Sequence, residues 1–233
     1  MTALVLQARL DSSRLKEKSL LPLGGRPLIF RVMEAFNSFP WDAKILACPE
    51  DSAASFSPLA EEAGFTIITG PKDDVLERYC IVIRKTGADR IVRATGDNPL
   101  VFADAAFALD KEARGLGADY AAHGGLPYGA GVEAVASSAL LRAGKEARAP
   151  MEREHVCPYL YAHPEIFALH RPLAPLKWQG PDMRITVDTQ EDYERACLLY
   201  NELLSLPQAE RRLGENIIAA YSRVFINGTG SKQ

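Results

Sequence analysis

The amino-acid sequence predicts an α/β fold built on a Rossmann-like wound, mostly parallel sheet. Three observations support this prediction. Short apolar runs alternate with stretches of helical periodicity from residue 3 to residue 95. Three successive strand–helix pairs require right-handed crossovers between parallel strands. The chain has 233 residues, of which 47% are hydrophobic and 24% charged, and this composition suits one globular domain.

The first expected element is the apolar run ALVL at residues 3–6, which is typical of a strand buried on both faces of a sheet. A Gln-Ala pair ends the strand, and a loop rich in cations and hydroxyl groups follows. A Gly-Gly pair then turns the chain sharply, and Pro27 stands where a helix over residues 27–37 is expected to begin.

The same alternation continues to residue 95. Strands are expected over residues 43–48, 65–69 and 90–94, and helices over residues 51–63 and 73–87. Asp51 is the expected cap of the first of these helices, and Gly64 closes it. Asp73 or Asp74 is the expected cap of the second helix, which stops at Gly87.

Beyond residue 95 the pattern is less regular. Helices are expected over residues 104–114, 137–148, 190–203 and 208–224, a mixed helical stretch over 151–163, and strands over 118–123, 132–136, 167–170 and 184–187. Ser137 is the expected cap of its helix. Residues 1–226 are predicted to form a single domain in which residues 124–180 make a lid or dimerisation arm. The Gly-rich residues 227–233 are predicted to form a disordered tail.

The composition excludes several classes of function. A net charge of -3 argues against general binding to nucleic acid or to a membrane surface. No apolar run approaches the roughly 20 residues that span a bilayer, and the N-terminus lacks the features of a signal peptide, so a cytoplasmic protein is expected. Four scattered cysteines without metal-binding spacing are expected to be reduced thiols: Cys48, Cys80, Cys157 and Cys197.

The loop after the first strand concentrates groups that bind anions. Its cations and hydroxyl groups are Arg9, Ser12, Ser13, Arg14, Lys16 and Lys18, against two acids, Asp11 and Glu17. Open α/β sheets bind ligands at the carboxyl ends of their strands, so an anionic ligand is expected here. A solvated basic loop that merely joins a strand to a helix explains the same residues.

Two aspartates follow later predicted strands. Asp97, in the string TGDNP, can reach a metal, because Mg²⁺ prefers a few hard oxygens together with phosphate and water. Asp97 is equally suited to a turn beside Asn98 and Pro99. Asp188, in the string VDTQED, stands at the start of a helix, where acidic residues and Thr189 are common capping groups.

Taken together, several strings resemble the motifs of cytidylyltransferases that activate acidic sugars as CMP conjugates. The strings are QARLDSSRLKEK, GPKDDVLERY, TGDNPL, EREHVCPY and VDTQED. The resemblance is to the branch described as spore coat polysaccharide biosynthesis protein F-like, and more distantly to CMP-KDO and CMP-acylneuraminate synthetases. It covers about residues 3–195 in the family's motif order. It implies a sheet of the nucleotide-diphospho-sugar transferase type.

The resemblance also implies roles for individual residues. Lys18, Arg14 and Asp97 are implied as catalytic, and Asp97 and Asp188 as ligands of Mg²⁺. The implied nucleotide-binding set is Gln7, Ala8, Arg9, Ser12, Ser13, Arg14, Lys18, Arg78, Thr95 and Gly96, and the implied acceptor-binding set is Glu133, Arg153, Glu154 and His155. A charged helix start explains the last three residues equally well.

The sequence departs from the family pattern at three places. Lys16 and Glu17 stand where Pro-Gly is usual, which puts the geometry of the phosphate loop in doubt. Gly131 stands where an aspartate is usual in the acceptor loop, which puts the identity of the acceptor in doubt. Gln190 replaces a proline, with no obvious chemical consequence.

The expected function is that of an Mg²⁺-dependent cytidylyltransferase. It would couple CTP to a small acidic sugar or related acceptor, release pyrophosphate and serve surface polysaccharide biosynthesis, as a homodimer without nucleic-acid or membrane partners. Two other functions stay open. One is a glycosyltransferase that uses a preformed nucleotide sugar, although Asp97-Asn98 lacks the second acid of a DxD motif. The other is an inactive homologue that only binds nucleotide.

Overall fold

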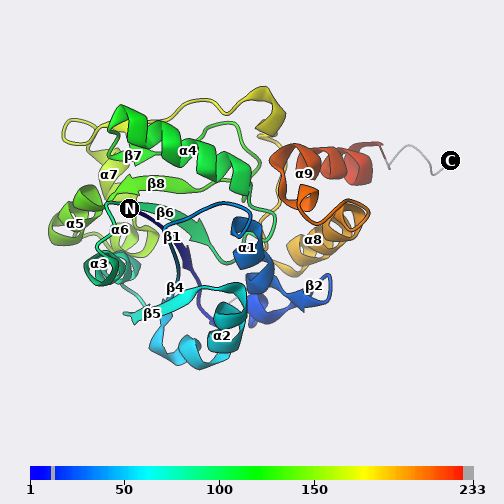
Figure 1. The fold of residues 1–233 in the computed structure, drawn as a ribbon, viewed down its shortest axis with the longest axis horizontal. Helices are drawn as coiled ribbons and strands as arrows, with labels where there is room; N and C mark the ends of the chain where they lie inside the picture. Colours follow the sequence, from blue (N-terminus) through cyan, green and yellow to red (C-terminus); the bar gives the residue numbers. More distant parts are fainter. Residues whose placement is uncertain (12–13, 228–233) are drawn as a thin grey trace.

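The computed structural model describes residues 1–11 and 14–227, which form a central sheet with helices on both faces (Figure 1). The strands of this sheet are β1 (Thr2–Gln7), β4 (Ala43–Pro49), β5 (Thr66–Gly70), β6 (Arg90–Thr95), β7 (Tyr120–Ala121), β8 (Glu133–Ala136) and β9 (Leu169–His170). A small hairpin pairs β2 (Pro22–Leu23) with β3 (Arg26–Pro27). Gly24 and Gly25 at its tip both have positive φ, as the predicted sharp turn requires.

Strand β1 lies in the middle of the sheet, whose order is β5-β4-β1-β6-β8-β7-β9. It pairs in parallel with β4 on one side and with β6 on the other, whereas β8 runs antiparallel to its neighbours. The chain leaves β1 toward one edge and later returns to its other side, and such a reversal opens a crevice at the carboxyl ends of the strands. Gln7 and Thr95 are register partners at that edge. The predicted wound, mostly parallel sheet is confirmed.

The helices form two layers. They are α1 (Leu28–Phe36), α2 (Glu50–Ala63), α3 (Val75–Thr86), α4 (Ala103–Leu116), α5 (Ser137–Glu146), α6 (Pro150–His155), α7 (Pro158–Ala162), α8 (Gln190–Leu203) and α9 (Gly214–Tyr221). Because side chains alternate along a strand, Leu4 and Leu6 pack with α1, α2, α4, α8 and α9, whereas Ala3 and Val5 pack with α3, α5 and α7. Figure 1 shows α8 and α9 at one end of the molecule and α5 and α7 at the other.

Residues 184–187 do not form the predicted strand. Arg184 makes an isolated bridge with Tyr128, and the residues after it lie outside any strand. Ile185 and Val187 are buried all the same. The alternating apolar pattern that predicts a strand here belongs to a loop that packs against the core.

The helix predicted over residues 208–224 is divided. It consists of the short helix η3 (Glu210–Arg212), α9 and the π-helix η4 (Ser222–Asn227). Leu213 is extended between η3 and α9, with φ -78° and ψ 130°. The backbone N–H of Gly214 donates to Asp104, and a Cβ on Gly214 would lie 2.5 Å from Phe102 Cδ2. Gly214 is thus held against Phe102 and Asp104 at the start of α4, and this contact interrupts the helix predicted over residues 208–224.

Several predicted boundaries and caps also differ. Strand β7 covers only two of the residues predicted over 118–123, and α2 begins one residue before Asp51, directly after Pro49. Ser137 is the first residue of α5 rather than its cap, and its buried hydroxyl has no hydrogen-bond partner among the described residues. The alternative cap Asp74 is confirmed, because its carboxylate accepts from the backbone N–H of Glu77 at 2.9 Å.

Residues 124–180 are partly built into the main sheet. They contribute β8, β9 and the three helices α5, α6 and α7, together with the short helix η2 (Leu176–Trp178). A lid or dimerisation role for this segment stays a prediction. The predicted disordered tail lies outside the described residues except for Asn227, the last residue of η4. Among the described residues, no helix combines the length and apolar character needed to cross a membrane.

The four cysteines are free, as predicted. Cys48, Cys80 and Cys157 are buried and Cys197 is partly buried. Burial raises the pKa of the Cys48 and Cys80 thiols to about 11. These thiols are therefore protonated at neutral pH and have the chemical character of small apolar side chains.

Candidate active site

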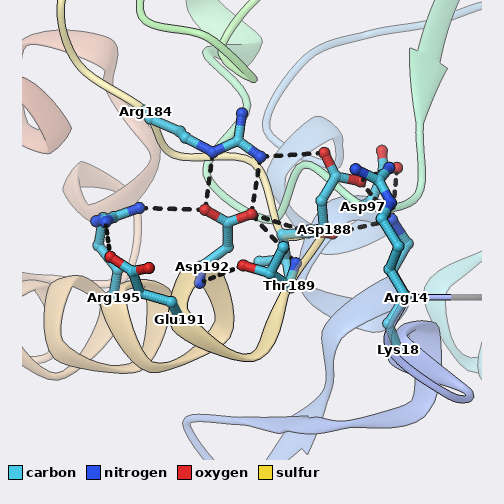
Figure 2. Close-up of polar contacts among 10 residues, drawn as sticks. Arg14, Lys18, Asp97, Arg184, Asp188, Thr189, Glu191, Asp192 and Arg195 are labelled. Atoms are coloured by element: carbon cyan, nitrogen blue, oxygen red, sulfur yellow. Dashed lines mark hydrogen bonds and ion pairs between the residues drawn. The ribbon is translucent and has the colours of Figure 1, made fainter.

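Lys18 lies at the centre of a cluster of charged side chains at the carboxyl edge of the sheet (Figure 2). It begins the short helix η1 (Lys18–Leu20), which follows the basic loop. Its Nζ donates to Asp97 Oδ2 at 2.9 Å, to Asp188 Oδ1 at 3.0 Å and to the Val187 carbonyl at 2.9 Å. An ammonium group has three N–H donors, and all three are used. A phosphate oxygen that accepts from Lys18 must therefore replace one of these acceptors.

Asp97 reaches this cluster because Gly96 lets the ends of two neighbouring strands approach closely. Gly96 follows β6, and its backbone N–H donates to the Gln7 carbonyl of β1 at 2.8 Å. A Cβ on Gly96 would lie 2.7 Å from Ile29 Cδ1, closer than two carbon atoms can pack. A larger residue in place of this glycine of the TGD string would require the Ile29 side chain to shift, and its Cβ would lie only 3.2 Å from the Gln7 carbonyl oxygen.

Asp188 stands at the junction between the loop at 184–187 and helix α8. Thr189 is the N-cap of this helix, because its Oγ1 accepts from the backbone N–H of Asp192 at 3.2 Å. The prediction that Thr189 caps α8 is confirmed. Because Thr189 caps the helix, the Asp188 carboxylate is available to bind cations. Its Oδ1 accepts from Lys18 Nζ and from Arg14 Nη2, each at 3.0 Å.

Arg184 and Asp192 belong to the same cluster, although no role in the site was predicted for them. Arg184 donates from Nε and Nη2 to the two oxygens of Asp192, both at 2.8 Å, and from Nη2 to Asp188 Oδ2 at 3.2 Å. Figure 2 shows the guanidinium bridging the two carboxylates. In the sequence these residues lie four positions before and four positions after Asp188, a spacing that could have suggested the contact.

The pairing of Arg184 with Asp192 shifts the pKa of both side chains. The hydrogen bonds from Arg184, with smaller contributions from backbone N–H groups, hold the pKa of Asp192 well below its usual range. The hydrogen bonds with Asp192 raise the pKa of Arg184 above its already high value. Both groups are therefore charged at every pH at which the protein is expected to work.

The other predicted nucleotide-binding residues lie at the same edge or in the basic loop. Gln7 and Thr95 end β1 and β6, and Ala8 follows Gln7. The Arg14 side chain is 65% exposed beyond its contact with Asp188. Arg9 is exposed, and its guanidinium forms no ion pair within the described part of the chain. The predictions for Ser12 and Ser13 lie outside the described residues.

Glu17 shows how this chain accommodates the loss of Pro-Gly. Its φ of 48° and ψ of 32° lie in the left-handed region, which glycine adopts at no steric cost. The loop therefore keeps a glycine-type conformation although it carries a glutamate. Lys18 keeps its contacts with both aspartates despite this departure.

Arg78 is placed inside the protein rather than toward the cluster. Its side chain is buried and donates from Nε and Nη2 to the Pro71 carbonyl at 3.1 and 2.7 Å, and from Nη2 to Lys72 O at 3.0 Å. It thus holds the turn between β5 and α3. In the described structure it contacts none of the residues around Lys18, so the predicted nucleotide contact has no direct geometric support.

Glu133 is also held by internal partners. Arg93 Nη1 donates to its Oε2, and the Tyr120 hydroxyl donates to its Oε1 at 2.9 Å. Arg93 Nε donates in turn to Gln7 Oε1 at 3.0 Å. Glu133 is therefore connected to the end of β1 through Arg93, and both of its oxygens are already hydrogen-bonded.

Of the predicted acceptor-binding residues 153–155, one is partly buried and two are exposed. Arg153 donates from Nε to Asp74 Oδ2 at 3.0 Å and from Nη1 to Gly144 O at 2.8 Å, which ties α6 to α3 and α5. Glu154 and His155 are exposed. None of the three contacts the Lys18 cluster within the described residues, and their acceptor-binding role stays a prediction.

The arrangement around Lys18 suits a divalent cation that is shared with a phosphate ligand. Oxygens of Asp97, Asp188 and Val187 all lie within 3.0 Å of one cationic atom, and the Val187 N–H donates to the Asp97 carbonyl at 2.9 Å. Mg²⁺ is commonly bound by one or two carboxylates together with substrate phosphates and water. Among the described residues, no group of three or more metal-binding side chains forms a complete protein cage. The two carboxylates could hold a divalent cation only together with other ligands, such as phosphate oxygens and water.

Comparisons with known proteins agree with this geometry. A family model described as Cytidylyltransferase matches residues 3–217. The chain is 30% identical over 205 residues to the spore coat polysaccharide biosynthesis protein SpsF of Bacillus subtilis. The aligned region covers 85% of each protein.

Two solved structures share the fold. A cytidylyltransferase from Leptospira borgpetersenii superposes with a TM-score of 0.85 at 23% identity, over 96% of this chain and 94% of that one. CMP:2-keto-3-deoxy-manno-octonic acid synthetase complexed with CTP superposes with a TM-score of 0.68 at 18% identity, over 86% and 98% of the two chains. The family match spans most of the chain and includes every motif around Lys18, and we conclude that this protein belongs to the cytidylyltransferase family of CTP-using nucleotidyltransferases.

Proposed function

We propose that the protein transfers the cytidylyl group of CTP to an oxygen of a small acidic acceptor, an acidic sugar or a related compound, and releases pyrophosphate. The observation that carries this proposal is the position of Lys18 between Asp97 and Asp188 at the carboxyl ends of β1 and β6. A cation and two carboxylates at this edge are the groups that nucleotidyl transfer needs. No side-chain nucleophile is required.

In this proposal the basic loop binds the triphosphate. Lys18, Arg14 and Arg9 oppose the negative charge that develops on the departing pyrophosphate, and most of the rate enhancement comes from position and electrostatic field. Gln7, Ala8, Thr95 and Gly96 form the surface beneath the nucleotide. Nucleotide binding by Ser12 and Ser13 stays a prediction from the sequence. Arg78 holds the turn between β5 and α3, and its contact with the nucleotide stays a prediction.

Asp97 and Asp188 are the proposed ligands of Mg²⁺. A divalent cation bound there neutralises phosphate charge and orients the triphosphate. The backbone that carries Asp97 is held at Gly96, and the Asp188 backbone N–H donates to Asp192 at the start of α8, so hydrogen bonds fix the backbone at both proposed ligands.

The acceptor is proposed to bind near Glu133, Arg153, Glu154 and His155. The name of the Bacillus subtilis relative supports a role in surface polysaccharide biosynthesis. The name of the structural relative complexed with CTP supports CTP as donor and a keto-deoxy sugar acid as the type of acceptor. We further propose a cytoplasmic homodimer that requires neither nucleic acid nor membrane.

The proposal is tested by incubating the purified protein with Mg²⁺ and each of CTP, ATP, GTP and UTP, with a panel of sugar acids and related acceptors. Pyrophosphate release and mass spectrometry of the products are the measurements. We expect pyrophosphate and a CMP conjugate with CTP and at least one acidic acceptor. Absence of pyrophosphate release with every nucleotide and acceptor would contradict the proposal.

The departures from the family pattern at Lys16-Glu17 and at Gly131 keep an inactive nucleotide-binding homologue as a second candidate. Calorimetry separates the two. Binding of CTP without turnover under any condition would support the inactive homologue, whereas turnover excludes it. Sugar transfer from a nucleotide sugar without pyrophosphate release would instead indicate a glycosyltransferase.

A further inference from the structure

We propose that Arg184 and Asp192 are positioning residues that set the orientation of the Asp188 carboxylate. They would thereby control the affinity of the site for its divalent cation. This inference rests on the proposed function for its effect on metal binding. Its structural part concerns only the contacts among the three side chains.

Asp188 needs side-chain support because its loop is not part of the sheet. Residues 184–187 lie outside any strand, so no ladder of strand hydrogen bonds fixes the backbone before Asp188. Ile185 and Thr186 donate to the Tyr128 carbonyl, and Val187 donates to the Asp97 carbonyl. The backbone N–H of Asp188 itself donates to Asp192 Oδ2 at 3.1 Å.

Asp192 makes more contacts than a helix cap needs. In the capping arrangement of α8 its carboxylate accepts from the backbone N–H of Thr189 at 3.2 Å. The same carboxylate, which is only 4% exposed, also accepts from Asp188 N, from both donors of Arg184 and from Arg195 Nη1 at 3.1 Å. Capping explains the contact with Thr189. It leaves the contacts with Asp188 and Arg184 unexplained.

Arg184 fixes the side chain of Asp188, as Asp192 fixes its backbone. Its Nη2 bridges Asp192 Oδ2 at 2.8 Å and Asp188 Oδ2 at 3.2 Å. With Oδ2 held in this way, Oδ1 faces Lys18 and Arg14. The bridging cation also offsets the repulsion between two neighbouring carboxylates. The guanidinium also binds the two oxygens of Asp192 through two different nitrogens, which the single nitrogen of a lysine cannot reproduce while it contacts Asp188.

A neighbouring loop holds the other side of Arg184. Its guanidinium lies over the Tyr128 ring, 4.9 Å from the ring centroid. Gly129 has φ 100°, and a Cβ there would lie 2.5 Å from the Thr186 nitrogen. The loop around Tyr128 therefore packs directly against residues 184–187. The Arg184 side chain remains 38% exposed, and its guanidinium contacts an aromatic ring and two carboxylates.

The test compares Arg184→Lys with the control Glu191→Gln. Glu191 lies next to Asp192 on α8, is 82% exposed and pairs only with Arg195 among the described residues. Binding of Mn²⁺ in the presence of CTP is measured by electron paramagnetic resonance, alongside the melting temperature. We expect Arg184→Lys to weaken Mn²⁺ binding about 10- to 100-fold, the usual effect of losing a group that orients a metal ligand, and Glu191→Gln to leave it unchanged.

A double variant separates positioning from a general loss of stability. If Arg184 acts through Asp188, adding Arg184→Lys to Asp188→Asn causes no further loss of Mn²⁺ affinity. A further tenfold loss in the double variant overturns the inference. So does an Arg184→Lys protein that melts at a lower temperature but binds Mn²⁺ with the affinity of the unsubstituted protein.

A crystal structure of Arg184→Lys provides a readout that is independent of CTP chemistry. The inference requires that Asp188 Oδ1 leave hydrogen-bond distance of Lys18 Nζ in this variant. An unchanged contact overturns the inference whatever the activity of the protein. Failure of the unsubstituted protein to bind Mn²⁺ with CTP would instead contradict the proposed function.

Discussion

Lys18 and Asp188 lie 170 positions apart in the sequence, yet Lys18 Nζ donates to Asp188 Oδ1 at 3.0 Å. Lys18 follows the first strand of the sheet and Asp188 precedes α8, so only the wound topology brings them together at one edge. Asp97 joins the same atom from the end of β6 at 2.9 Å. Three distant motifs therefore share one ammonium group.

Lys18→Ala and Asp97→Asn are each expected to lower turnover at least about 100-fold. Groups that are oriented in advance toward developing charge contribute on this scale. Steady-state pyrophosphate release with CTP is the measurement. Lys145→Ala is the control, because Lys145 is an exposed lysine on α5, outside the loop that is proposed to bind the triphosphate. Near-normal turnover in either of the first two variants would mean that this cluster is not the active site.

The layered sheet was predictable because its signal is local. Runs such as ALVL in β1 are short and apolar, and the glycine after α3 closes that helix in the left-handed conformation at φ 67°. Residues 184–187 show the limit of such reasoning. Their alternation of apolar residues matches a strand, but the partner that would complete a ladder is a loop around Tyr128. Sequence periodicity reports burial and cannot report whether a neighbouring strand is present.

The site was predictable only in part, for a related reason. Motifs located Lys18, Asp97 and Asp188, whose contacts follow from strand ends that meet at one edge. Arg78 and Arg153 carry the same charge as Lys18, but the structure directs them to carbonyl groups and to Asp74. The partner of a cation depends on which loops surround it, and the spacing of motifs along the chain does not report which loops those are.

Glu17→Gly is expected to raise the free energy of unfolding by about 0.5–1 kcal/mol, or to leave it unchanged. Glutamate at φ 48° bears a steric cost that glycine avoids, although glycine loses more conformational entropy on folding. Chemical denaturation is the measurement. Lys16→Gly serves as the control, because Lys16 is not among the residues with positive φ and should lose stability. Equal destabilisation by both substitutions would contradict the left-handed assignment.

Asp192→Asn is expected to lower the melting temperature at neutral pH, and the difference should shrink in acid. Hydrogen bonds from Arg184 hold the pKa of Asp192 well below its usual range. A depressed pKa stabilises the fold above the unfolded value of about 3.9, and this contribution is lost as pH falls through the folded value. Melting curves from pH 7 downward measure the effect. A difference that stays constant below about pH 4 would contradict this origin of the stabilisation.

Gly96→Ala is expected to destabilise the protein by about 1–3 kcal/mol, the usual cost of overpacking, and to lower turnover by displacing Asp97. The added methyl group would lie 2.7 Å from Ile29 Cδ1 and 3.2 Å from the Gln7 carbonyl oxygen. Gly115→Ala is the matched control, because Gly115 lies in α4, where an added Cβ would have no described atom within 4 Å, and alanine is the better helix former by about 0.5–1 kcal/mol. Thermal unfolding and CTP turnover are measured for both variants, and only Gly96→Ala is expected to lose stability and activity. If Gly96→Ala were as stable and as active as the unsubstituted protein, the close approach of β1 and β6 that positions Asp97 would be disproved.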